Sequence, residues 1–67
     1  MLELSNSLKA VRTAHGLTQQ QLADVVQVSR KTINTVENGV FIPSTVLSLR
    51  LAKALKVTVE ELFHLVL

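Results

Sequence analysis

The chain has 67 residues, 48% of them hydrophobic, and a formal net charge of +2. This length allows one domain, which we expect to span residues 1–67, and the weak positive charge permits a nucleic-acid partner without requiring one. The absence of cysteine excludes disulfides and thiolate metal sites, and two histidines are too few for a metal site by themselves, so we expect neither metal nor cofactor.

The first predicted helix begins at Ser5 or Asn6 and ends at His15. Apolar residues recur there at helical spacing, and Gly16 is a natural left-handed stop. We interpret His15 as a capping residue in the last turn of this helix rather than as a ligand.

The second predicted helix begins at Thr18 and ends near Gln27. Thr18 and Gln21 have the spacing of a capping box, in which a hydroxyl and an amide satisfy each other's backbone N–H groups. The third predicted helix spans residues 30–38, between a capping Ser29 and a terminating glycine. The very short turn between these two helices makes them cross steeply, which is the geometry of a helix-turn-helix.

A proline-containing connector precedes the last two predicted helices. Ser44 caps a fourth helix, which extends to Leu55 or Lys56. Thr58 begins a second capping box and a fifth helix over residues 59–64. The fold class is therefore all-α with five helices.

Both ends of the chain alternate apolar and polar residues. The apolar members are Leu2 and Leu4 at one end and Phe63, Leu65 and Leu67 at the other. This period of two predicts two short strands that pair antiparallel. The alternative is that the termini are frayed, as termini often are.

The third helix carries the candidate functional surface. Ile33 and Val36 are its apolar pair, so the opposite face carries Arg30, Lys31, Asn34, Thr35 and Asn38. Cations in the first turn of a helix oppose its dipole, at a cost of a few tenths of a kcal/mol, which suggests a purpose outside the helix. Base edges and phosphates of DNA would provide one. The alternative is a face that only improves solubility.

A longer pattern surrounds this helix. Its pieces, in chain order, are LTQQQLA, VSRKTINTVENG, PS and LAKALKVTVEELF. Together they resemble the Cro/CI-type (XRE-like) helix-turn-helix family over roughly residues 7–63. The resemblance implies a sequence-specific DNA-binding transcriptional regulator, more often a repressor than an activator, whose third helix enters the major groove.

The resemblance also assigns individual residues. Arg30, Lys31 and Thr35 match positions that read bases, and Asn34 is an additional candidate. Gln19 matches a position that grips phosphate through its side chain and the helix N-terminus. Further backbone contacts are expected from Thr18, Thr32, Asn38 and Ser44.

Arg12 and Glu37 match a pair that forms a salt bridge in the family. Each directly follows an apolar core position, and a charge near the core usually needs a partner. The alternative is that both point to water.

Some positions depart from the family pattern. Gln27 and Lys56 stand where glycine is common, and left-handed geometry there would cost each about 1 kcal/mol. Val40 stands where the family often has lysine or arginine. Thr45 occupies a position that is usually apolar, and Val46 occupies one that is usually polar. None of these positions lies in the third helix.

The fourth helix has more apolar residues than one small bundle can bury. Such an excess predicts a protein interface, here a homodimer that reads an inverted repeat with half-sites about 34 Å apart. The residues expected in or near this interface are Leu47, Val59, Leu65 and Leu67. The alternative is a monomer in which the terminal strands cover the apolar residues that the bundle leaves exposed.

Two other functions compete with DNA binding. A protein-interaction module would need an apolar or aromatic outward face on the third helix, whereas this face is polar. An enzyme is disfavoured because neither histidine has a nucleophile at helical spacing, and no small-molecule ligand is evident. We expect no membrane partner and a cytoplasmic location, because no signal peptide and no apolar run of about 18 residues is present.

Overall fold

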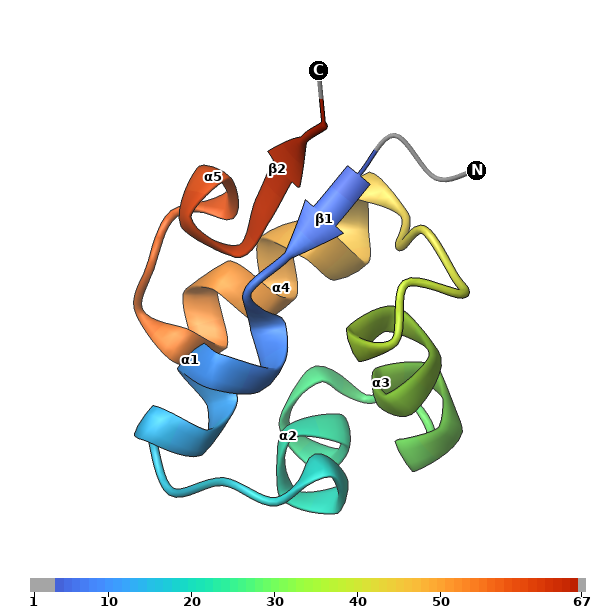
Figure 1. The fold of residues 1–67 in the computed structure, drawn as a ribbon. Helices are drawn as coiled ribbons and strands as arrows, with labels where there is room; N and C mark the ends of the chain where they lie inside the picture. The colour runs from blue at the N-terminus through green and yellow to red at the C-terminus, as the bar shows by residue number, and fades with distance from the viewer. Residues whose placement is uncertain (1–3, 67) are drawn as a thin grey trace.

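Five helices and two short strands follow the expected order (Figure 1). The computed structural model of the protein describes residues 4–66. The elements are β1 (Leu4–Asn6), α1 (Leu8–Ala14), α2 (Gln19–Val26), α3 (Arg30–Glu37), α4 (Thr45–Leu55), α5 (Val59–Leu62) and β2 (Phe63–Leu65). The all-α class and the additional strand pair are both confirmed.

Hydroxyl side chains define where four of the helices begin. Thr18 accepts a hydrogen bond from the backbone N–H of Gln21 at 3.0 Å, and the Gln21 side chain accepts one from the Thr18 N–H at 2.8 Å. Thr58 and Glu61 form the same reciprocal arrangement at the start of α5. The hydroxyls that cap α3 and α4 belong to Ser29 and Ser44. All four caps lie where the sequence predicts them.

The strand pair shortens α1 and α5 relative to the prediction. Asn6 lies in β1 opposite Phe63 of β2, so α1 begins at Leu8 and α5 ends at Leu62. The Asn6 side chain accepts a hydrogen bond from the Leu8 N–H at 3.1 Å and donates one to the Val36 carbonyl at 2.9 Å. Pairing with a distant segment therefore overrides the local helical pattern at both ends. His15 directly follows α1, as its C-cap.

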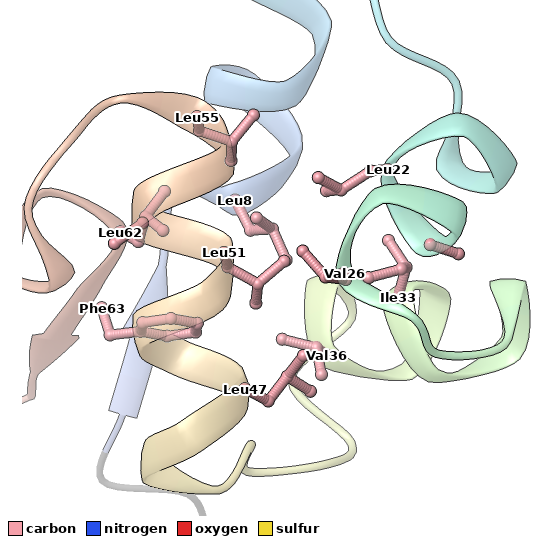
Figure 2. Packing of buried hydrophobic residues seen from close by; sticks show 12 residues of the cluster. Leu8, Leu22, Val26, Ile33, Val36, Leu47, Leu51, Leu55, Leu62 and Phe63 are labelled. Atoms are coloured by element: carbon pink, nitrogen blue, oxygen red, sulfur yellow. The ribbon is translucent and has the colours of Figure 1, made fainter.

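α4 supplies the centre of the core. Leu51 and Leu55 of this helix are fully buried, and full burial of such a side chain stabilises the fold by about 1.5–3 kcal/mol. Figure 2 shows side chains from the other elements around α4, among them Leu8, Leu22, Val26, Ile33, Val36, Leu62 and Phe63. The prediction that Ile33 and Val36 face the core is confirmed.

Leu47 also belongs to this core. Only 7% of the residue is exposed, and it lies beside Val36 (Figure 2). The prediction that Leu47 contributes to a dimer interface is therefore corrected, because its side chain is already covered by its own chain.

Two helices end in left-handed residues that are not glycine. Gln27 has φ 61° and Lys56 has φ 57°. In both places the next residue closes the helix, with Val28 N–H donating to the Ala23 carbonyl and Val57 N–H donating to that of Ala52. The left-handed geometry considered from the sequence is thus present at both positions.

The described chain measures 31 × 22 × 20 Å along its principal axes.

Candidate nucleic-acid interface

α2 and α3 form the predicted helix-turn-helix. Only residues 27–29 separate Val26, the end of α2, from Arg30, the start of α3. The left-handed Gln27 reverses the chain, and the Ser29 hydroxyl caps the next helix at once. Because the buried Ile33 and Val36 fix which side of α3 meets the core, the opposite side faces solvent.

The solvent-facing side of α3 is polar and positively charged. Arg30, Lys31 and Asn34 are exposed and Thr35 is half-buried. The first turn of α3 has no acidic residue, and neither cation forms an ion pair within residues 4–66. Both positive charges are therefore available to an external anion.

The predicted ion pair between Arg12 and Glu37 is present and buried. Arg12 Nε lies 2.6 Å from Glu37 Oε2, and the two side chains are 9% and 2% exposed. A second guanidinium nitrogen donates to Glu37 Oε1 at 3.3 Å, and a third to the Leu17 carbonyl at 2.7 Å. The alternative in which both groups point to water is wrong. The pair joins α1 to the C-terminal end of α3.

Gln19 extends this pair toward the solvent-facing side of α3. Its Nε2 donates to Glu37 Oε1 at 3.0 Å and to Asn34 Oδ1 at 3.2 Å. Asn38 Nδ2 also donates to Asn34 Oδ1, at 3.3 Å. Sequence reasoning treated Gln19 and Asn34 as separate contact residues. Their hydrogen bond was missed because it joins side chains on two helices whose relative rotation follows from packing.

The hydroxyls proposed for phosphate contact also have structural roles. Thr18 and Ser44 accept hydrogen bonds at their helix starts and keep their own protons for an external acceptor. The Thr32 hydroxyl lies 3.0 Å from that of Ser29, and Thr35 donates its proton to the Thr32 carbonyl at 3.0 Å. Thr35 therefore offers acceptor lone pairs outward, while Thr18 and Ser44 offer donors.

Several large apolar side chains outside α3 are exposed, among them three on β2 and α4. Leu65 of β2 is 74% exposed, and Val46 and Leu49 of α4 are 58% and 56% exposed. Val59 is half-buried against the core, and Leu67 lies outside the described residues. Leu49 lines an open groove of about 500 Å³ between α4 and α5. The strand pair leaves Leu65, Val46 and Leu49 exposed, whereas most other apolar residues of α4 are buried in the core of the same chain.

No helix within residues 4–66 is long and apolar enough to cross a membrane. No three histidine, cysteine or acidic side chains gather there in a group that could hold a metal ion.

Comparison with known proteins identifies the same architecture. A family model described as helix-turn-helix matches residues 8–62. Among curated proteins, the chain is 34% identical over 62 residues to YgzD of Bacillus subtilis, covering 92% of this chain and 94% of that protein. It is 42% identical over 60 residues to a protein of Methanocaldococcus jannaschii, covering 90% and 91%. Both relatives are named as uncharacterized HTH-type transcriptional regulators.

Solved structures agree. The restriction-modification controller protein C.AhdI from Aeromonas hydrophila is 39% identical, with a TM-score of 0.76 over 81% of this chain and 82% of that one. A protein from Bacteroides fragilis superposes with a TM-score of 0.83 over 91% of this chain and 98% of that one, and at 24% identity it supports the fold alone. The capped α2–α3 pair, the family match and the similar regulators lead to one conclusion: this chain belongs to the Cro/CI-type (XRE-like) helix-turn-helix family and is a DNA-binding transcriptional regulator.

Proposed function

We propose that the protein is a repressor that reads its operator with α3 in the major groove. The observation that carries this proposal is the solvent-facing side of α3, on which Arg30 and Lys31 are exposed and without ion pairs in residues 4–66. Arginine and lysine make specific contacts to guanine, so these two side chains are assigned to base edges. Asn34 and Thr35 are assigned to neighbouring bases.

The N-terminus of α2 and nearby hydroxyls would hold the DNA backbone. Backbone N–H groups and the positive end of a helix dipole attract phosphate. Thr18 and Ser44 have hydroxyl protons available, and Thr32 and Asn38 lie on or directly after α3. Gln19 begins α2, so its backbone N–H is the group we assign to phosphate, while its side chain is bound to α3. Such contacts set the position of the protein without selecting sequence.

We further propose that two copies bind an inverted repeat. Leu65, Val46 and Leu49 are exposed apolar side chains that such an interface would bury, and self-complementary pairing about a two-fold axis is the commonest way for identical chains to associate. Half-sites about one DNA turn apart require two reading helices. The half-buried Val59 borders the same groove as Leu49, and Leu67 follows β2 in the sequence.

Residues 1–67 are proposed to act as one domain, in the cytoplasm, with no enzymatic activity and no cofactor. A chain this small has little room for a substrate cleft beside a DNA-binding surface.

Selection of bound fragments from a random duplex library tests these proposals together. We expect the recovered sequences to share an inverted repeat with half-site centres about 10 base pairs apart. Placing that repeat between a promoter and its start site should lower transcription in a purified system when the protein is added. Recovery of no common sequence would contradict specific reading by α3, and a rise in transcription would contradict repression.

A further inference from the structure

The side-chain amide of Asn34 is held in one orientation by its neighbours. Its Oδ1 accepts hydrogen bonds from Gln19 Nε2 at 3.2 Å and from Asn38 Nδ2 at 3.3 Å. Its Nδ2 donates no hydrogen bond to any residue between 4 and 66, and Asn34 is exposed. The carbonyl oxygen is thus occupied within the protein, and the NH₂ group remains available to a ligand.

The orientation follows from the buried ion pair. The Glu37 carboxylate has only acceptor atoms, so the Gln19 amide must direct its NH₂ group toward it. The same Nε2 atom reaches Asn34, so Asn34 must direct its oxygen toward Gln19. If the Asn34 amide were reversed, two NH₂ groups would face each other and both hydrogen bonds to Oδ1 would be lost.

An unconstrained asparagine reads adenine with two hydrogen bonds. Its NH₂ group donates to adenine N7 while its oxygen accepts from the N6 amino group. That contact needs both ends of the amide. In Asn34 the oxygen is already used, so the bidentate adenine contact would first have to break the hydrogen bonds from Gln19 and Asn38.

We propose that Asn34 is a donor-only contact that selects guanine. This inference rests on the proposed function, in which α3 enters the major groove. Guanine presents two adjacent acceptors there, N7 and O6, whereas adenine and thymine each present one, so a group that only donates has the most partners at guanine. Cytosine presents a donor at its major-groove edge and is rejected. Gln19 acts as a positioning residue, because it fixes which end of Asn34 faces the DNA.

The test compares four proteins in the same selection from a random duplex library. They are the parent chain, Asn34→Ala, Gln19→Ala and a control, Gln20→Ala. Gln20 also lies in α2, but its side chain bonds to Asp24 and is outside this set of contacts. Because Glu37 keeps its bonds to Arg12 when Gln19 is shortened, Gln19→Ala should fold, which a thermal melt of each variant checks.

The expected result concerns a single base pair of the half-site. The parent and Gln20→Ala should enrich guanine there, and Asn34→Ala should lose that preference alone, by about three- to tenfold for one hydrogen-bonded contact. Gln19→Ala should keep the rest of the motif but shift the same position toward adenine, since Asn34 is then free to turn.

Three results would overturn the inference while leaving the proposed function standing. The parent could select adenine at the Asn34-dependent position, Gln19→Ala could leave the guanine preference intact, or Asn34→Ala could weaken all sequences equally, as loss of a phosphate contact would. If the parent enriched no sequence at all, the proposed function would fail together with this inference.

Discussion

At the scale of single residues, the α3 surface divides into side chains free to bind DNA and side chains that hold the helix in place. Arg30 and Lys31 belong to the first group, and Glu37 belongs to the second. The types of the free residues could be predicted from the sequence, because helical spacing alone separates them from Ile33 and Val36. The orientation of the Asn34 amide could not, since it depends on a hydrogen bond between two helices.

Replacing either exposed cationic side chain of α3 with alanine should weaken specific binding without unfolding the protein. A good base contact contributes about 1–3 kcal/mol of discrimination, so Arg30→Ala and Lys31→Ala should each bind the selected operator roughly 5- to 150-fold less tightly. Titration against operator and scrambled duplexes at one salt concentration measures this. Lys53→Ala removes an exposed cation from α4 instead and should leave discrimination unchanged. Parent-like operator affinity in both α3 variants would show that α3 does not read the bases.

Removing Glu37 should destabilise the fold. Glu37→Ala leaves the buried Arg12 guanidinium without its counter-charge, which costs about 3 kcal/mol or more. For a domain of this size, that corresponds to a fall of about 10 °C or more in the thermal midpoint. The control is Glu60→Ala, which removes an exposed carboxylate from α5 and should change the midpoint little. Equal midpoints for the two variants would contradict the structural role of the pair.

At the scale of helices and strands, local chemistry determined what the sequence could predict. Every cap assigned to a serine or threonine is present, because capping depends on residues within one turn. The ends of α1 and α5 were misplaced because the pairing of Asn6 with Phe63 joins opposite ends of the chain. Leu47 was misassigned because α4 is apolar on several sides, so only its packing against other elements decides which side is buried.

The turn between α2 and α3 gives a prediction at this scale. Gln27 is left-handed, with φ 61°, and a non-glycine residue in that conformation carries roughly 1 kcal/mol of strain or more. Glycine removes the strain, but it also raises the conformational entropy of the unfolded chain, which lowers stability by about 0.4–1 kcal/mol. Gln27→Gly should therefore raise the free energy of unfolding slightly, by up to about 1 kcal/mol. Urea unfolding measures the change.

Two further substitutions serve as comparisons for the stability of Gln27→Gly. Lys56→Gly replaces the other left-handed residue and should behave in the same direction as Gln27→Gly. Ala10→Gly lies within the right-handed α1 and should lower stability by about 1 kcal/mol. A clear loss of stability in Gln27→Gly, similar to that in Ala10→Gly, would mean that Gln27 has no strain to relieve.

At the scale of the whole molecule, the exposed apolar residues of α4 and β2 lie outside α3, so the proposed association and base reading should separate by mutation. Leu65 is 74% exposed, and in a two-fold interface Leu65→Asp places two like charges near each other. Sedimentation should show a shift toward monomer. Binding to an operator with two half-sites should fall far more than binding to one, while base preference within a half-site is retained.

Val25→Asp is the matched control for that experiment. Val25 is 61% exposed on α2, outside the proposed interface, so the variant introduces the same charge without separating the two copies. A parent chain that sediments as a monomer at micromolar concentration and binds one and two half-sites equally would contradict the dimer.

The longest dimension of the described chain, 31 Å, is shorter than the distance of about 34 Å between half-site centres one DNA turn apart. One copy presents a single α3 within residues 4–66 and therefore reads one half of the proposed operator. Where free protein is mostly monomeric, the concentration of dimers rises with the square of the monomer concentration. For the proposed dimer, a twofold change in the amount of protein would then change the concentration of competing dimers about fourfold, and gene output would respond steeply to a modest change in expression.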